Sequence, residues 1–338
     1  MKTSKHHTWL RRILAGCMAL MLLVTATACS SGKNGASSSQ VVIYCNSDDE
    51  AIEAMKKTLD DSGYKGKYAI QTFGTTELGG KLLAEGKNIE ADMVVMSSFY
   101  VDSAQEKNDM FAPLEIAKKP LAEYPDYYRP LLANQGAIFY NTEEVKNDNL
   151  PLPASLKDLT KPEYKGKLSV TDISGSSTAW LMIQALVDAY GEDGASKVLA
   201  AMYQNAGDNL EESGSAPIKK VLAGEAAIGF GLRHQAVKAK NEGKPIDFID
   251  PTEGNFTLTE GVAVVDKKDD AKKQQAQEIA NLLVDKSRAE LQTYYPLALY
   301  DGETTDPDNI GQYSKEFKEP LTVDLLKKHM QLSEDAKK

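Results

Sequence analysis

Short apolar runs that alternate with segments of helical periodicity constrain the fold of this chain most. Residues 41–44 are apolar and mostly β-branched, and after a polar loop the apolar residues of 51–59 recur at helical spacing. The same order of strand, loop and helix is expected over 68–84 and again over 91–107. Strands that alternate with helices indicate a parallel sheet with helices on both faces, so we expect an α/β fold.

A second α/β series is expected after a connection rich in Pro and Tyr at 120–130. The apolar stretch 136–141 predicts a strand, and the apolar residues of 179–190 predict a long helix. Further strands are expected at 167–171, 226–230, 246–249 and 259–265. The remainder of the chain is expected to be mostly helical.

Small polar residues stand where the expected strands of the first series end. Ligands of open α/β sheets bind beyond the carboxyl ends of the strands, so these residues are candidates for a binding site. They are uncharged, and most carry a hydroxyl. The candidates are Asn46, Ser47, Gly74, Thr75, Thr76, Ser97 and Ser98.

Two loops of the second series combine hydroxyls and glycine and are followed at once by a helix. First-turn N–H groups have no partner within their helix, and the helix dipole is positive there, so such a loop suits an anion. An ordinary N-cap with a turn glycine would have the same sequence. The candidates are Ser174, Gly175, Ser176, Ser177 and Thr178 in one loop, and Glu212, Ser213, Gly214 and Ser215 in the other.

Arg233 and His234 follow the expected strand 226–230 and therefore stand at an edge of the sheet. A guanidinium at that place can hold two oxygens of a phosphonate or carboxylate. The alternative is an Arg paired with an acidic side chain, and His234 can equally be structural or exposed to solvent.

The motifs of common enzymes are absent from the sequence. It has no nucleophile elbow, no HExxH and no P-loop, so no enzyme activity, resident cofactor or metal site is predicted. Two adjacent tyrosine pairs, 127–128 and 294–295, have the side chains that can bind ferric iron, but packing is the favoured interpretation of both.

The first 39 residues predict export. A basic start, an apolar run at 13–24 and small residues before Cys29 form a signal peptide over 1–28. A cysteine directly after the cleavage site resembles a bacterial lipoprotein, which implies a lipid on Cys29 and an anchor in the cell membrane. Residues 29–39 are then a flexible tether. The competing cysteine, Cys17, has no apolar segment before it.

Charge and cysteine content limit the partners. The chain has a formal net charge of -10, and the expected signal peptide is basic, so the mature protein is more negative still. Nucleic acid is therefore not expected as a partner, and a monomer is expected. Only Cys45 would remain unlipidated after cleavage, which excludes an internal disulfide.

Several segments, taken in order, resemble the extracellular solute-binding proteins of ABC importers, in the branch that includes iron(III), polyamine, thiamine and 2-aminoethylphosphonate binders. The resemblance extends over about residues 40–295. The segments that carry it are 136–142, 159–167, 172–179, 212–217, 224–229, 251–254 and 260–263.

The resemblance implies two α/β lobes, of the class II periplasmic-binding-protein type, joined by a hinge of two crossing strands. The first lobe would be 40–138 plus 258–338, and the second 139–257. A small-molecule solute would bind in the cleft between them and pass to an ABC transporter permease, with closure by hinge motion.

The resemblance favours a small anionic or zwitterionic solute, such as the phosphonate 2-aminoethylphosphonate. Tyr140 and Glu260 join the candidate ligand residues on this basis, and Asp172, Glu212 or Glu260 would suit a ligand ammonium. Ferric iron or a polyamine such as spermidine or putrescine remains the alternative, although the stretch 211–217 lacks the adjacent tyrosines of the iron binders.

Overall fold

The computed structural model of the chain describes residues 40–318 and 321–338. The expected signal peptide, Cys29 and the tether lie outside the described residues. Within those two ranges, no helix is both long enough and apolar enough to cross a membrane.

Strands and helices alternate along the described chain. Up to the first long strand they are β1 (Val41–Cys45), α2 (Asp49–Leu59), β2 (Tyr68–Thr72), α3 (Thr75–Glu85), β3 (Met93–Ser97), α4 (Ser98–Asn108), β4 (Phe111–Ala112) and β5 (Arg129–Asn141). They continue as α5 (Thr142–Asn147), β6 (Leu168–Thr171), α6 (Thr178–Ala206), β7 (Leu210–Glu211), α7 (Ala216–Ala223), β8 (Ile228–Leu232), α8 (Arg233–Asn241), β9 (Ile246–Ile249), β10 (Asn255–Val265), α9 (Asp270–Leu282), α10 (Arg288–Tyr294), β11 (Ser314–Lys315) and α11 (Val323–Ala336).

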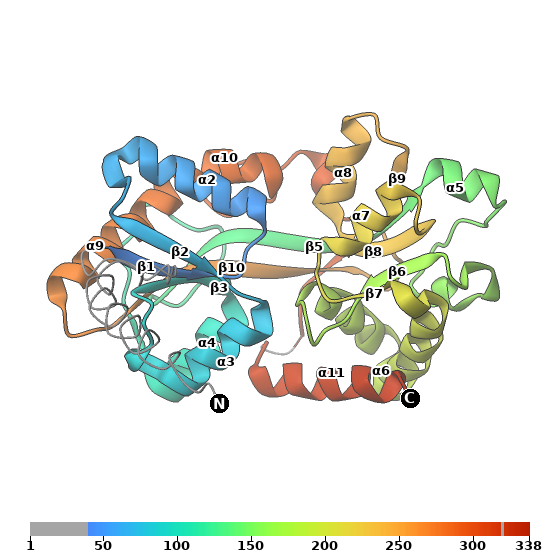
Figure 1. The fold of residues 1–338 in the computed structure, drawn as a ribbon, viewed down its shortest axis with the longest axis horizontal. Coiled ribbons are helices and arrows are strands. Elements are labelled where there is room, and N and C mark those ends of the chain that lie inside the picture. Colours follow the sequence, from blue (N-terminus) through green and yellow to red (C-terminus); the bar gives the residue numbers. More distant parts are fainter. Residues whose placement is uncertain (1–39, 319–320) are drawn as a thin grey trace, which may run out of the picture. The chain divides into compact units, whose positions relative to one another are not determined.

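The strands of the described residues form one mixed sheet, with the main order β2-β1-β3-β10-β5-β8-β6-β7. β1 is parallel to β2 and β3, and β6 is parallel to β8. In the middle, β5 and β10 run antiparallel to each other and to their outer neighbours β8 and β3 (Figure 1). The α/β class is therefore confirmed, while the expectation of a wholly parallel sheet is corrected. We call the part built on β1 to β3 the first lobe and the part built on β6 to β9 the second lobe.

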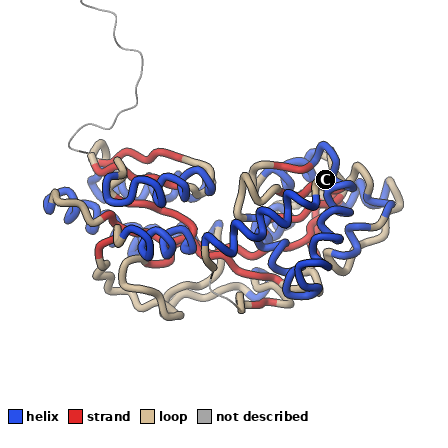
Figure 2. The backbone as a smooth tube through the Cα atoms, turned by 90° about the horizontal axis from the view of Figure 1, so that it is seen from below, coloured by secondary structure: helices blue, strands red, loops and turns tan. Residues whose placement is uncertain are grey.

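Buried apolar strands explain why each lobe folds around its own core. β1, β3 and β8 are buried along their whole length, as expected for strands covered on both faces. Ile43, Met55 and Val95 belong to the core of the first lobe. Phe139 and Val221 belong to a separate core in the second. Figure 2 shows helices around both halves of the sheet.

β5 is longer than the sequence indicated, because it begins within the stretch expected to be a connection. Pro130 cannot donate a hydrogen bond to a neighbouring strand, which made a strand improbable there. The structure accommodates it at an irregularity in the pairing: Gly261 lies opposite Pro130, whereas Glu260 lies opposite Leu132. A bulge of this kind leaves one residue unpaired and tolerates the missing donor.

The C-terminal helix α11 contacts elements on both sides of the predicted lobe boundary. His329 accepts a hydrogen bond from Trp180 of α6 over 2.7 Å, and both side chains are buried. At its other end, the Val323 N–H donates to Ser103 of α4. Trp180 also meets Phe99 of α4 edge to face, with ring centroids 4.8 Å apart. The boundaries at 138/139 and 257/258 remain a prediction.

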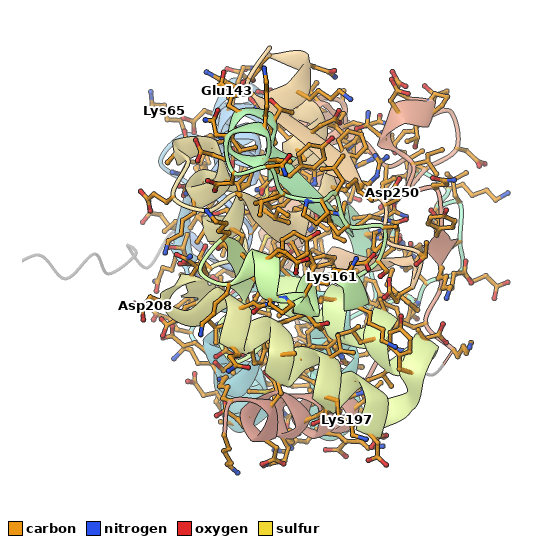
Figure 3. The ribbon with its side chains drawn as sticks, turned by 90° about the vertical axis from the view of Figure 1, so that its right-hand side faces the viewer. Lys65, Glu143, Lys161, Lys197, Asp208 and Asp250 are labelled. Atoms are coloured by element: carbon orange, nitrogen blue, oxygen red, sulfur yellow. The ribbon has the colours of Figure 1, made fainter. Side chains whose placement is uncertain are left out.

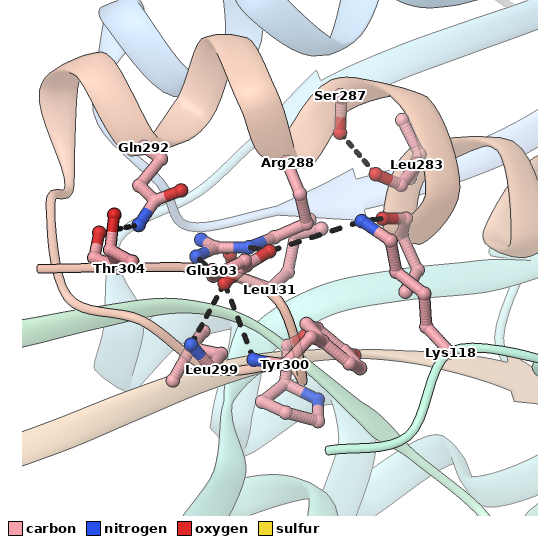
Figure 4. A network of polar contacts seen from close by, with 12 residues as sticks. Lys118, Leu131, Leu283, Ser287, Arg288, Gln292, Leu299, Tyr300, Glu303 and Thr304 are labelled. Carbon is pink, nitrogen blue, oxygen red and sulfur yellow. Dashed lines mark hydrogen bonds and ion pairs between the residues drawn. The ribbon is translucent and has the colours of Figure 1, made fainter. Parts of the chain in front are cut away.

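A buried ion pair fixes the segment that follows α10 (Figure 4). Arg288 is fully buried and donates to both carboxylate oxygens of Glu303, over 3.1 and 2.7 Å, and to the carbonyl of Leu131 in β5. Burial by itself would raise the pKa of Glu303, but hydrogen bonds from Arg288 and from the Leu299 N–H keep it below its usual value. The pair therefore ties this segment to the central sheet.

Arg288→Ala is expected to lower the free energy of unfolding by about 3–5 kcal/mol, because it leaves the Glu303 carboxylate buried without its partner. Urea denaturation at pH 7 measures the change. The control is Lys119→Ala, which removes an ion pair with Asp301 whose side chains are 80% and 57% exposed. The control should change stability by less than about 1 kcal/mol. Equal effects of the two substitutions would contradict a structural role for Arg288.

Candidate functional site

A small cavity of about 50 Å³ lies where the two lobes meet, and we call it the inner cavity. Its lining comes from the carboxyl ends of strands and the first turns of helices in both lobes. The first-lobe side contributes Asn46, Asp48, Thr75 and Ser97, the second-lobe side contributes Leu181, Gly214 and Leu232, and the loop before α6 contributes Ser176, Ser177 and Thr178. Asn134 of β5, Leu258 and Glu260 of β10 and Tyr295 complete the lining.

The three strand ends of the first lobe come together as the sequence predicted. The Asn46 side chain donates to the hydroxyls of Thr75 and Ser97, over 3.0 and 3.4 Å. This contact joins the ends of β1 and β3 to the start of α3. The Asn46 side-chain oxygen, Oδ1, is buried and has no hydrogen-bond partner among the described residues, so it can accept from a ligand.

The two hydroxyl-rich loops of the second lobe pack against each other, and two glycines make this possible. A Cβ on Gly214 would collide with the Thr178 hydroxyl, and a Cβ on Gly175 would collide with the carbonyl of Glu212. Close approach of the loops places Gly214 beside the N-terminus of α6, at the wall of the inner cavity. The sequence predicted both loops but could not show that they touch.

Four helices begin at the inner cavity. Asp48 and Ser97 are the N-cap residues of α2 and α4, Thr75 is the first residue of α3, and Ser177 caps α6. In α2, α4 and α6 no first-turn N–H donates to the N-cap side chain, and the N-cap residue of α3, Gly74, has no side chain. The positive ends of four helix dipoles therefore face one small volume, which favours a negatively charged group.

Asp48 is a ligand candidate that the sequence analysis missed. An Asp at an N-cap usually accepts a hydrogen bond from its own helix, but the Asp48 carboxylate accepts none. It also has no ion pair with any described residue. Burial, and then the charge of Glu50, raise the pKa of Asp48 to about 6, although Lys219 opposes the shift. An uncompensated carboxylate at a cavity wall suits a cation or an ammonium group.

Glu260 is the second carboxyl of the inner cavity. It lies on β10 opposite Ser97, is 9% exposed, and accepts a hydrogen bond from the Ser47 hydroxyl over 2.7 Å. Burial raises the pKa of Glu260 to about 7, and the Ser47 hydrogen bond only partly opposes this. No Lys, Arg or His belongs to the described lining, so neither carboxyl is neutralised inside the cavity.

Arg233 does not form the predicted clamp for an oxyanion, because its guanidinium is bound to other residues of the protein. Its guanidinium donates to both oxygens of Asp250, over 2.8 and 3.1 Å, and to the carbonyl of Asp308. The Arg233 side chain is 5% exposed and lines no part of the inner cavity. Figure 3 labels Asp250 in its place on the second-lobe side. The guanidinium is committed to a buried partner, which was the alternative that the sequence left open.

Other candidates also lie outside the inner cavity. His234 packs against Tyr295, with ring centroids 4.7 Å apart, and burial lowers the pKa of His234 to about 3. Tyr140 pairs with Ile228, at the opposite end of β8 from the cavity residue Leu232. Six further candidates do not line the inner cavity but lie close in sequence to residues that do: Gly74, Thr76, Ser98, Ser174, Gly175 and Glu212. Ser47, Ser213 and Ser215 line a neighbouring, larger cavity.

Two further lining residues could not be found from the local sequence. Asn134 lies in β5 between the expected connection, 120–130, and the expected strand, 136–141. Its side-chain oxygen is buried without a hydrogen-bond partner among the described residues. Tyr295 ends α10, and burial raises the pKa of its hydroxyl well above the usual value. Among residues 40–318 and 321–338, no group of three or more His, Cys, Asp or Glu side chains is placed to hold a metal ion.

Comparison with known proteins identifies a family and a fold. Residues 88–309 match the family described as bacterial extracellular solute-binding protein. The chain is 28% identical to an Fe(3+)-binding periplasmic protein of Serratia marcescens, over 62% of this chain and 61% of that protein. It is 27% identical to a spermidine/putrescine-binding periplasmic protein of Escherichia coli K12, over 59% of this chain and 60% of that protein. These two alignments span about three fifths of each relative's length.

A solved structure resembles the chain over almost its whole described length. The periplasmic binding protein AfuA from Actinobacillus pleuropneumoniae, with fructose-6-phosphate bound, has a TM-score of 0.71 at 22% identity. The match covers 87% of this chain and 97% of that one. At this identity the likeness shows the fold, and the two-lobed α/β architecture predicted from the sequence is confirmed.

Glu260→Gln is expected to raise the free energy of unfolding of the ligand-free protein by about 2 kcal/mol at pH 8. The reason is that the folded state binds a proton at Glu260 more tightly than the unfolded chain does. The pKa of Glu260 is 4.5 in the unfolded chain and about 7 in the folded protein. The stability that Glu260 contributes is therefore lost as the pH rises between these two values.

Urea denaturation between pH 5 and pH 8 measures this effect. Glu260→Gln should flatten the pH dependence, and the two proteins should be nearly equally stable at pH 5. Glu53→Gln, at an exposed position of α2, is the control and should leave the profile unchanged. A variant that is less stable than the parent at pH 8 would contradict the burial argument.

Proposed function

Because this chain belongs to the family of bacterial extracellular solute-binding proteins, we propose that it captures a small zwitterionic solute and presents it to the permease of an ABC importer. The class of solute proposed is an aminophosphonate such as 2-aminoethylphosphonate. One observation carries the proposal: four helix N-termini and two un-neutralised carboxyls face the same inner cavity. This arrangement suits a ligand with charges of both signs.

The anionic end of the ligand is assigned to the helix N-termini. Backbone N–H groups of the first turns and the hydroxyls of Thr75, Ser97 and Thr178 are donors for phosphonate oxygens. A cavity of about 50 Å³ has room for a few waters, which is the size of an oxyanion head rather than of a large solute. The head group would be bound without a cationic side chain.

The ammonium end is assigned to Asp48 and Glu260. At neutral pH the Asp48 carboxylate is largely ionised, and the Ser47 hydroxyl favours the ionised form of Glu260. Charge-assisted hydrogen bonds from an ammonium would replace the water that these carboxyls lose on burial. This role replaces the one expected for Arg233, whose guanidinium is bound to Asp250.

A polyamine is the second candidate, since a relative binds spermidine and putrescine and the lining has two carboxyls and no cation. The helix N-termini argue against it, because a polyamine has no anionic group to place against their positive ends. Ferric iron is supported by a relative's name and by Tyr295 in the lining. Its adjacent tyrosine, Tyr294, instead lies under the Lys238 ammonium, so the pair does not present two phenolates.

The proposed location is the outer face of the cell membrane, with lipid on Cys29. A tether of about ten residues keeps the protein near its importer and so raises the effective concentration of the docking surface. The Ser- and Gly-rich composition of residues 30–39 suits a flexible connection that lets the lobes open and close.

Isothermal titration of the mature protein is expected to show 1:1 binding of 2-aminoethylphosphonate at pH 8 and weaker binding as pH falls through 7 and 6. Protonation of Glu260 and then of Asp48 removes the ammonium's partners over that range. Asp48→Asn should weaken binding at pH 8 about 10- to 100-fold and flatten the part of the pH profile near pH 6, where Asp48 titrates. The flattening separates the protein's titration from that of the phosphonate.

Two controls sharpen the titration. Glu53→Gln removes a carboxylate from the exposed face of the same helix and should change affinity less than about twofold. Spermidine and ferric citrate complete the panel. Tight binding of spermidine without phosphonate binding would support a polyamine as the ligand. A coloured complex with ferric citrate would support ferric iron. Silence across the panel, with no thermal shift, would contradict the proposed ligand class.

Cys29→Ser is expected to move the protein from the membrane fraction of expressing bacteria to the soluble extracytoplasmic fraction, because the variant lacks the thiol that receives lipid. Immunoblots of separated fractions measure the change. The released protein should bind solute with the affinity of the parent. A variant that stays with the membrane would contradict lipid anchoring at Cys29.

A further inference from the structure

A second cavity, of about 490 Å³, adjoins the inner cavity, and we call it the outer cavity. This volume is within the range of small-molecule sites, whereas the inner cavity is far below it. Its first-lobe wall is the start of α2, with Ser47, Asp48, Asp49 and Glu50. Its second-lobe wall comes from the loop before α7, from α7 and from α8 with the residue that follows it.

Asp48 lines both cavities, so the two cavities meet at this residue. The loop after β1 and the loop before α7 each contribute neighbouring residues to the two cavities. Asn46 and Gly214 line the inner cavity, while their neighbours Ser47 and Ser213 line the outer one. A ligand with an oxyanion in the inner cavity and a nitrogen at Asp48 has its remaining space in the outer cavity.

The outer cavity combines an apolar strip with an excess of acidic groups. Leu222 and Ile218 of α7 and Ala239 of α8 form the strip. Around it stand four carboxylates, Asp48, Asp49, Glu50 and Glu242, and two ammonium groups, Lys219 and Lys238.

Gln235 gives the outer cavity a hydrogen-bond acceptor. Its side-chain oxygen is buried and has no hydrogen-bond partner among the described residues. The Lys238 ammonium lies 4.8 Å from the centre of the Tyr294 ring, so one of the two cations is already engaged. Methylene groups beside the strip and a polar or cationic end beside the carboxylates match this lining.

We propose that the outer cavity is a second subsite for the same ligand, taking an alkyl chain carried on the nitrogen that Asp48 holds. The inference rests on the proposed function and extends it. The preferred substrate class is then an N-alkylated aminophosphonate or amino acid, a secondary amine, rather than the primary amine alone. A chain that ends in an ammonium gains further from the acidic excess.

Titration with 2-aminoethylphosphonate and its N-propyl and N-(3-aminopropyl) derivatives tests the subsite. Each methylene buried against the strip should improve affinity about three- to fourfold, so the N-propyl compound should bind at least about tenfold tighter than the parent. The aminopropyl compound should bind tighter still, and its additional gain should shrink as salt is raised.

Leu222→Ser tests the strip directly, because Leu222 is only half-buried and its replacement should leave the fold intact. The affinity ratio of N-propyl compound to parent should fall from about ten towards one. Leu152→Ser, at a 51% exposed position outside both cavities, is the matched control and should preserve the ratio. Thermal melts confirm that both variants are folded.

The outcomes separate the two proposals. If 2-aminoethylphosphonate binds and the N-propyl compound binds no tighter, the subsite is overturned while the proposed function stands. If the N-propyl compound gains affinity but Leu222→Ser preserves the ratio, the outer cavity is also overturned as the source. If no compound of the series binds, both proposals fail together.

Discussion

The pairing of β5 with β10 is the constraint on which the rest of this molecule depends. On the first-lobe side β5 pairs with β10 up to Gln135, and from Gly136 onward it pairs with β8. Gly136 is required at this change of partner, because a Cβ there would collide with the Phe230 ring. Asn134 lies beside the change and lines the inner cavity. The paired strands thus lie between the two lobes, at the point where the carboxyl ends of the parallel strands of each lobe meet the inner cavity.

The buried guanidinium groups and the carboxyls of the inner cavity differ in whether they have a partner of opposite charge. Arg233 and Arg288 are buried, and each is matched by a carboxylate, Asp250 or Glu303, so they stabilise the fold without facing a ligand. At the inner cavity, Glu260 is buried and Asp48 is partly buried, and neither has such a match. Groups that weaken the ligand-free fold and have no structural partner are typical of functional sites. These two guanidinium groups therefore belong to the scaffold, whereas the charged side chains that line the inner cavity are both carboxyls.

Local sequence patterns predicted the strand ends and hydroxyl loops, because periodicity, glycine and N-cap chemistry act within a few residues. Asn46, Thr75 and Ser97 meet at one cavity, as the carboxyl-end rule requires. Arg233 pairs with Asp250 instead of facing the cavity, and local sequence could not predict this because tertiary structure brings the two residues together. Asp48 was missed because its sequence is that of an ordinary N-cap, and only the absent capping bond distinguishes it. The start of β5 was missed because the bulge beside Pro130 forms only against β10, a strand far away in sequence.

The contact of Trp180 with Phe99 has an optical consequence. The chain has two tryptophans, and the other, Trp9, lies within the expected signal peptide, so the mature protein would have a single indole. That indole touches an aromatic ring of the first lobe while its N–H is bound to His329 of α11. A change in the distance between α4 and α6 would alter the polarity and quenching around this single fluorophore. Emission from the unlabelled protein would then report the change in real time, without an attached dye.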